Sequence, residues 1–156
     1  MQPAYHPQFF SPAQQQTIEV LSELILPASH DAAEKLQPGA KAAGVAEFID
    51  FMVFNDPTLH APFRDGLRWL DHAGPSPFSS LPPEAQSAIL ERLAYRAKHR
   101  KSEKAGQEFF HLMRRYTVMG FYTTRIGLES LDYPGLTFYS TSPGCTHHDN
   151  PEHVGL

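Results

Sequence analysis

Residues 102–125 read SEKAGQEFFHLMRRYTVMGFYTTR and decide the fold, because apolar side chains recur there at spacings of three and four. That spacing is the period of an α-helix. Five residues form the stripe that should face the domain core: Phe109, Leu112, Met113, Tyr116 and Gly120. Three more form a second stripe on another side: Phe110, Thr117 and Phe121. We therefore expect this helix to be buried on two sides, by neighbouring helices or by another chain.

Four shorter helices precede the long one, each marked by the same periodicity and by residues that start or stop a helix. Ser11 is a typical N-cap and Pro12 a typical first helical residue, whereas Pro27 ends the segment. Gly74 ends the third helix, and Ser102 is the expected N-cap of the long one. The five expected helices cover residues 12–26, 40–55, 56–73, 84–98 and 102–125.

The predicted fold is all-α, with about five helices packed as a small orthogonal bundle. No alternating run long enough for a sheet is present, and residues 27–39 are a turn-rich connection. The 156 residues suffice for one domain with its own core. Helical periodicity fades after Arg125 into a segment rich in Gly, Pro, Tyr, Ser and Thr. We expect a helical domain over residues 1–125 and, as part of it, a long irregular C-terminal docking arm over residues 126–156.

The charge pattern disfavours nucleic acid as a partner. The net charge of -4 is spread along the chain without a basic or acidic tail. The basic run from Arg92 to Lys104 is interpreted as a solvated helix end with a short linker. No stretch approaches the roughly 18 apolar residues that cross a bilayer, so no direct membrane span is expected. The first residues, MQPAYHPQFF, also lack the charged and apolar regions of a signal peptide.

Signatures of cofactor sites and of nucleophilic catalysis are missing. The sequence has no G-x-G-x-x-G, no P-loop, no G-x-S-x-G, no H-E-x-x-H and no C-x-x-C-H. We therefore assign this chain no catalytic residue, no cofactor-binding residue and no metal ligand.

Two groups of residues are candidate metal sites. Glu108 and His111 have the Glu-x-x-His spacing of di-iron helical bundles, but such sites need the motif twice, and only one copy is present. The tail carries a second group, which a polar, proline-containing terminus more often leaves solvated. That group consists of His147, His148, Asp149 and His153.

Cys145 is the only cysteine of the chain, and its meaning depends on the compartment. In a reducing environment it is a small apolar side chain without a partner, whereas in an oxidising one an unpaired thiol indicates a bond to another chain. The preceding Pro143 and Gly144 favour a turn that lies close against another surface. Both interpretations remain open at this point.

Aromatic residues are concentrated between the long helix and the arm. Eight of the eighteen Phe, Tyr and Trp residues lie between Phe109 and Tyr139. The arm is too irregular to bury its own tyrosines fully, and tyrosine commonly anchors protein interfaces. The expected partner interface consists of Phe121, Tyr122, Tyr133, Phe138, Tyr139 and Cys145.

Several stretches together resemble a known family, gluconate 2-dehydrogenase subunit 3, the small subunit of bacterial flavin-dependent sugar dehydrogenases. The matching stretches are FFSPAQQQTIEVLSELILPA, GAKAAGVAEFIDFMV, FRDGLRWLD, EFFHLMRRYTVMGFYTTRIGLESLDYPG and SPGCTH. In this order and spacing they cover most of the chain from Phe9 to His147. One departure is the turn LDYPG at residues 131–135, where the more usual Leu-Gly-Tyr-x-Gly has one glycine more.

The resemblance implies an assembly. A large FAD-binding subunit of the glucose–methanol–choline type oxidises the sugar and often passes electrons to a cytochrome c component. The small subunit is non-catalytic and supports the stability, maturation and export of its partner, typically through a twin-arginine signal. Family members also place a cysteine in the segment that matches Pro143 to Cys145, which favours an intersubunit disulfide at Cys145.

This implies a periplasmic protein whose signal peptide has been removed, although a native start at Met1 would indicate a cytoplasmic one. Two alternatives stay open beside the accessory subunit. One is a metal-binding helical enzyme that uses Glu108 and His111. The other is a stand-alone cytosolic helical adaptor whose tail binds some other partner.

Overall fold

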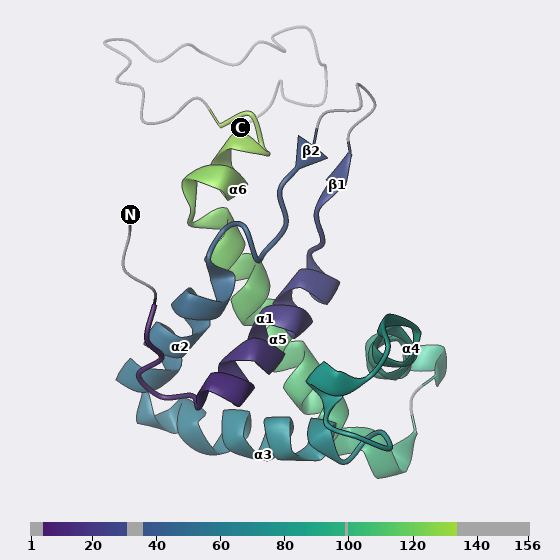
Figure 1. The fold of residues 1–156 in the computed structure, drawn as a ribbon. Coiled ribbons are helices and arrows are strands. Elements are labelled where there is room, and N and C mark those ends of the chain that lie inside the picture. Colours follow the sequence, from purple (N-terminus) through teal and green to yellow (C-terminus); the bar gives the residue numbers. More distant parts are fainter. Residues whose placement is uncertain (1–4, 31–35, 99, 134–156) are drawn as a thin grey trace, which may run out of the picture.

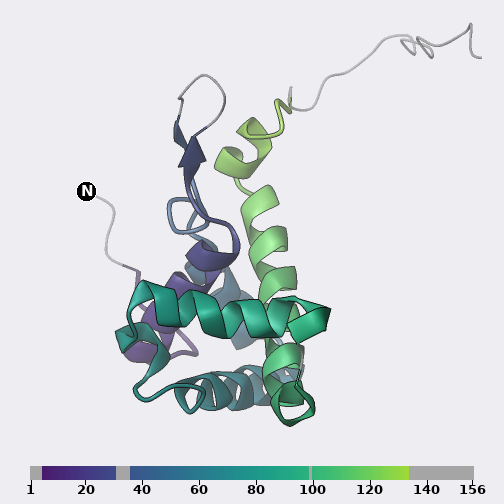
Figure 2. The same ribbon diagram turned by 90° about the vertical axis from the view of Figure 1, so that its right-hand side faces the viewer.

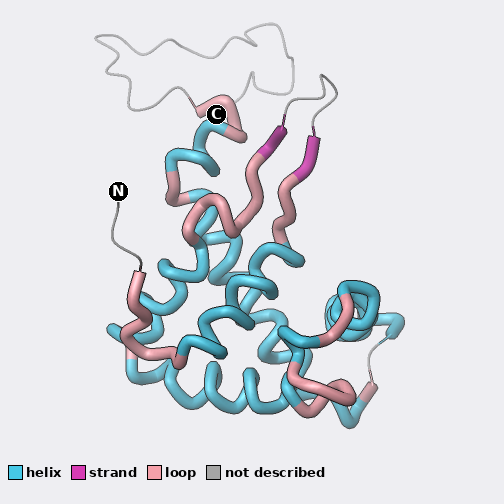
Figure 3. Tube along the Cα trace, viewed as in Figure 1, coloured by secondary structure: helices cyan, strands magenta, loops and turns pink. Residues whose placement is uncertain are grey.

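The computed structural model describes residues 5–30, 36–98 and 100–133 (Figure 1). Over these ranges the chain forms six α-helices and one hairpin of two-residue antiparallel strands, so the prediction of an all-α fold is confirmed (Figure 3). The helices are α1 (Pro12–Ile25), α2 (Val45–Asn55), α3 (His60–Asp71), α4 (Pro83–Ala94), α5 (Lys104–Tyr122) and α6 (Arg125–Glu129). The strands are β1 (Ser29–His30) and β2 (Leu36–Gln37). Each helix of the described ranges is too short or too polar to cross a bilayer.

The predicted start of α1 is confirmed in detail. The Ser11 hydroxyl accepts a hydrogen bond from the Gln14 backbone N–H at 3.3 Å, and the Gln14 side chain accepts one from the Ser11 N–H at 3.0 Å. This reciprocal capping box satisfies two N–H groups that the first turn of a helix leaves free. Pro12 follows as the first helical residue, where its missing N–H costs nothing.

Helix α5 is the centre of the bundle. It contacts α1, α2, α3, α4 and α6. Figures 1 and 2 show α3 passing beneath α5 and α4 running across it, so both cross α5 steeply rather than lying parallel to it. This matches the orthogonal packing expected from the sequence.

The crossing of α3 and α5 is built from glycines and aromatic rings. Gly66 of α3 lies directly against the Phe109 ring, and Gly106 of α5 lies directly against the Trp69 ring, so a Cβ atom at either glycine would overlap the ring. The two helices therefore interlock, each providing a small residue where the other has a large one. Phe63 continues this contact, with its ring centroid 5.9 Å from both Phe109 and Tyr116.

Both predicted stripes of α5 are buried by the chain itself. Of the first stripe, only Leu112 remains half-buried, while the others lie in the core. Phe110, Thr117 and Phe121 of the second stripe are buried as well. The second apolar side of α5 is thus covered by neighbouring helices, which was one of the two explanations that the sequence left open.

Several predicted helix boundaries are wrong for local reasons. Helix α2 begins at Val45 rather than at residue 40, because Gly44 adopts a left-handed backbone with φ of 69° that interrupts the helix. Helix α4 ends at Ala94, because Tyr95 is extended. Ser102 does not cap the long helix, since residues 101–103 form a separate 3₁₀ turn and α5 starts at Lys104.

The irregular arm that the sequence predicts from residue 126 begins instead with a helix. α5 ends at Tyr122, and the Thr124 hydroxyl then caps α6 by accepting a hydrogen bond from the Gly127 N–H at 3.1 Å. Residues 134–156 of the predicted arm lie outside the described residues. Figures 1 and 2 show α6 and the β1–β2 hairpin projecting from the same end of the molecule.

Candidate partner-binding surfaces

The predicted interface residues fall into four groups. Phe121 is only 3% exposed, so its ring belongs to the core of this domain rather than to its surface. Tyr122 is half-buried and meets the edge of the Phe121 ring at a centroid distance of 5.1 Å. Tyr133 is exposed. Phe138, Tyr139 and Cys145, together with the predicted intersubunit disulfide, lie outside the described residues.

The end of α6 presents two large apolar side chains to solvent. Leu131 is 59% exposed and Tyr133 is 47% exposed. Their backbone is fixed rather than free, because the Tyr133 N–H donates to the Leu128 carbonyl at 3.1 Å and Asp132 adopts φ of 52°. Asp is one of the few residues other than glycine that accept this left-handed conformation. This turn therefore holds Leu131 and Tyr133 on the surface, immediately before residue 134.

The outer face of α5 carries a surface that we call the α5 ridge, made of His111, Arg114, Arg115, Val118 and Met119. All five side chains are exposed. In the part of the chain that the structure describes, neither Arg114 nor Arg115 pairs with a carboxylate. Arg115 lies over the Tyr116 ring at 5.2 Å. The α5 ridge thus combines exposed apolar side chains with positive charge that no carboxylate of the described residues pairs with.

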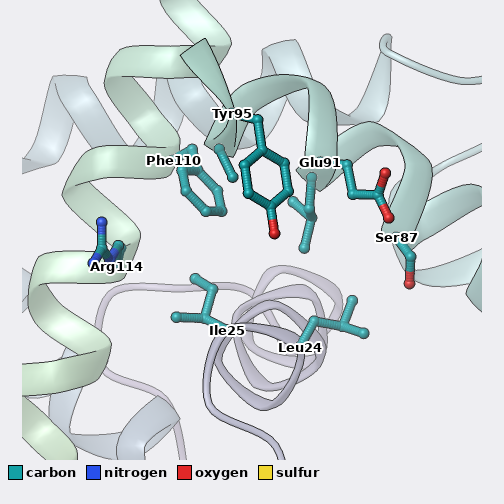
Figure 4. A pocket seen from close by; sticks show the side chains of 9 residues that line it. Leu24, Ile25, Ser87, Glu91, Tyr95, Phe110 and Arg114 are labelled. Atoms are coloured by element: carbon teal, nitrogen blue, oxygen red, sulfur yellow. The ribbon is translucent and has the colours of Figure 1, made fainter. Parts of the chain in front are cut away.

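A cleft of about 290 Å³ adjoins the α5 ridge, between the end of α1, α4 and the first half of α5 (Figure 4). Its apolar lining is formed by Leu24, Ile25, Leu90 and Phe110. Tyr95 is 60% exposed, and Figure 4 shows its ring at the cleft with the hydroxyl directed toward α1.

Arg114 lines both the cleft and the α5 ridge, so the two form one continuous surface. The other charged residue of the cleft, Glu91, is already paired with Lys98 at 2.7 Å. The net charge that the cleft offers to an occupant is therefore the positive charge of Arg114.

Helix α2 carries exposed aromatic residues that the sequence reasoning missed. Phe51 is 54% exposed and Phe54 is 49% exposed, and they lie one turn apart on the same helix face. A sequence pattern does indicate these exposed rings: residues 48–54 read FIDFMVF, and Asp50 is the only polar side chain among them. A helix that is apolar all round is expected to be covered on more than one side, as was argued for α5.

A buried carboxylate, Asp50, holds the N-terminal segment on α2, and no sequence pattern predicts this contact. Asp50 is fully buried, and its two oxygens accept four hydrogen bonds from residues 5–10. The donors are the Tyr5 hydroxyl at 2.7 Å and the backbone N–H groups of Gln8, Phe9 and Phe10 at 2.7, 3.0 and 3.0 Å. The whole carboxylate is thus used for attachment of this segment.

The electrostatics of this contact follow from its donors. Burial alone would raise the pKa of Asp50, but the three backbone N–H groups and the Tyr5 hydroxyl outweigh burial and hold the pKa below its usual value. The pKa of Tyr5 is raised, first by burial and then by its hydrogen bond to Asp50. Tyr5 therefore stays a neutral donor and Asp50 an ionised acceptor over the physiological range.

The residues of the metal alternative lie on the exposed side of α5. Glu108 is 3.6 Å from Lys104, with which it forms an ion pair one turn apart. His111 meets the Phe110 ring edge-on. The described residues contain no group of three His, Cys, Asp or Glu side chains able to hold a metal. His147, His148, Asp149 and His153 lie outside them.

Comparison with known proteins yields one match. The model of the family gluconate 2-dehydrogenase subunit 3 matches residues 12–144, well over half of the chain. No curated protein and no solved structure matches the chain. The matched range contains the crossing of α3 and α5, both stripes of α5, the cleft and the α5 ridge. On the extent of this match, the chain belongs to the gluconate 2-dehydrogenase subunit 3 family.

Proposed function

We propose that this chain is a non-catalytic small subunit that binds and stabilises a large FAD-dependent sugar dehydrogenase of the glucose–methanol–choline type and helps it to mature or to be exported. In this proposal FAD belongs to the partner, a cytochrome c subunit is a further component, and the complex works in the periplasm. The family supports a subunit of a dehydrogenase complex, and the proposal adds what the subunit does there.

One observation carries the proposal: apolar side chains continue along the surface of α5 and α6 although the core is already complete. Val118 and Met119 are exposed on α5, and Leu131 and Tyr133 follow at the end of α6. Contiguous exposed apolar residues mark protein interaction sites in soluble proteins. This surface leads directly to residue 134, beyond which the sequence predicts the remaining contacts, Phe138, Tyr139 and Cys145.

The maturation role is tested by producing the proposed large subunit with and without this chain. We expect soluble, FAD-loaded large subunit, measured by its flavin absorbance and sugar-dependent dye reduction, only when both chains are made together. An equal yield of active flavoprotein without this chain would contradict the role.

The proposed bond to the partner is tested separately at Cys145. Non-reducing electrophoresis of the native complex is expected to show a band that contains both chains and that thiol reduction separates. The Cys145→Ser variant should lose the band while the two chains still co-elute. A single-chain band from an oxidised, intact complex would rule the disulfide out.

A further inference from the structure

The surface formed by the α5 ridge and the cleft has a specific chemistry. Its centre is apolar, with Val118 and Met119 on the α5 ridge and Leu90 and Phe110 in the cleft. Its charge is positive, because Arg114 and Arg115 have no carboxylate partner in the described residues, whereas Glu91 is neutralised by Lys98. Tyr95 adds an exposed ring with a hydroxyl at the cleft (Figure 4).

Arg114 and Arg115 form an adjacent pair of exposed arginines on α5. Of the other arginines and lysines on the described α-helices, Arg64 lies over the Phe9 ring at 5.0 Å, and the rest pair with a carboxylate, namely Arg68, Arg92, Lys104 and Arg125. Both face solvent, and no carboxylate of the described residues pairs with either Arg114 or Arg115, although the chain carries an excess of acidic residues. Arginine beside exposed apolar and tyrosine side chains is the composition that protein interfaces favour.

The surface is also continuous with the contacts of the proposed function. Val118 is followed one turn later on the same face by Tyr122, after which the chain enters α6 and reaches Tyr133. A partner that contacts Tyr122 would therefore meet the α5 ridge on the same face of α5.

We propose that the α5 ridge and the cleft bind an acidic surface of the large dehydrogenase subunit. Carboxylates of that subunit pair with Arg114 and Arg115, and one of its apolar side chains enters the cleft beside Tyr95. This inference rests on the proposed function and adds the chemistry of the partner surface. Charge complementarity of this kind fixes the register of two proteins and speeds their association.

The test reverses the charges of Arg114 and Arg115. Its effect on binding to the large subunit is compared with that of an equal charge reversal outside the α5 ridge. Arg114→Glu/Arg115→Glu changes the net charge of the chain as much as Arg100→Glu/Lys101→Glu does. Arg100 and Lys101 are also exposed and outside any ion pair within the described ranges, but they precede α5, whose first residue Lys104 lies roughly 15 Å from Arg114 along the helix axis. Affinity for the purified large subunit is measured by surface plasmon resonance at several salt concentrations.

We expect the reversal on the α5 ridge to weaken binding at least about tenfold and to flatten its salt dependence, with less than about a threefold loss for the control pair. Arg114→Glu alone gives a second test that keeps the contact of Arg115 with Tyr116. Tyr95→Ala probes the cleft and should also weaken binding. Circular dichroism verifies that each variant is folded.

Three results would overturn the inference, and they are distinguishable. If the wild-type chain binds and both double variants bind equally well, the docking face lies elsewhere, and the proposed function stands. If the wild-type chain alone forms a dimer that the reversal on the α5 ridge abolishes, the occupant is a second copy of this chain. If the wild-type chain does not bind the large subunit at all, the proposed function fails together with this inference.

Discussion

At the scale of single residues, Asp50 has the largest predicted effect. Its carboxylate accepts four hydrogen bonds and attaches residues 5–10 to α2, which in turn places Phe10 in the core 5.8 Å from Phe63. Removing one partner of a buried hydrogen-bonded group costs more than the bond itself is worth, because the other partners are left unsatisfied. Asp50 therefore links the N-terminal segment to the packing of the whole domain.

Replacing Asp50 by Asn should destabilise the chain by about 1–3 kcal/mol, because the amide brings donors toward backbone N–H groups that need acceptors. Urea unfolding followed by circular dichroism measures this change. The control is Asp65→Asn, which removes an exposed carboxylate 3.4 Å from Arg68 and should cost less than about 1 kcal/mol. Equal urea midpoints for Asp50→Asn and Asp65→Asn would show that the contact of Asp50 with residues 5–10 contributes nothing to stability.

The pH dependence of stability gives an independent test of the same group. The folded-state pKa of Asp50 lies below its usual value, so the folded chain holds the charged form more strongly than the unfolded chain does. This contribution is fully present above the unfolded pKa of about 3.9 and is lost as the pH falls through the folded pKa.

The free energy of unfolding should therefore decline more steeply below about pH 4 in the wild-type chain than in Asp50→Asn. Asp56, whose pKa the Thr58 hydroxyl and N–H also lower, is present in both proteins and cancels in the comparison. The account of Asp50 would be contradicted if the free energy of unfolding declined equally in the two proteins as the pH falls below about 4.

At the scale of helices, the crossing of α3 and α5 depends on the absence of side chains at two positions. Gly66→Ala places a methyl group against the Phe109 ring. Alanine is the better helix former by about 1 kcal/mol, yet overpacking a tight crossing costs about 1–3 kcal/mol. We therefore expect a net loss of stability, measured by urea unfolding.

Truncating the Phe109 side chain should recover part of the stability that Gly66→Ala loses. Phe109→Ala destabilises the wild-type chain by removing buried apolar surface, but in the Gly66→Ala background it also removes the Cγ and Cδ2 atoms that the new methyl group would overlap. The double-mutant cycle should show a favourable coupling between the two positions. Strictly additive changes in the free energy of unfolding would mean that the side chains at positions 66 and 109 do not clash.

Sequence patterns predict a helix well where all residues of the pattern lie within that helix. The stripes of α5 and the N-cap at Ser11 depend on residues within a few positions of each other, so the local sequence contains them. The start of α2 and the end of α4 were misplaced, since the left-handed Gly44 and the extended Tyr95 are set by how the chain must turn to pack.

The candidate surfaces were less predictable than the fold. Phe121 was expected at the interface because it is aromatic and close to the arm, but α5 turns it into the core. The exposure of Phe51 and Phe54 was not predicted, although residues 48–54 of α2 contain a single polar side chain, Asp50. The cleft unites residues of α1, α4 and α5 that are far apart in the sequence, and no local pattern reveals such a meeting.

At the scale of the whole molecule, the chain has a complete core and still exposes apolar side chains on α2, α4–α5 and α6. A complex that covers them stabilises the folded chain by mass action. The melting temperature of this chain should therefore rise when the large subunit is added in excess, and it should not rise with an unrelated flavoprotein.

Binding between the two chains is the central claim, and size-exclusion chromatography with light scattering tests it most directly. The purified chain is mixed with the large FAD-dependent subunit that is proposed as its partner. The account predicts one peak that contains both chains in a fixed ratio, with flavin absorbance and the summed mass. Separate elution of a stable chain and a stable flavoprotein, at concentrations where both remain soluble, would contradict it.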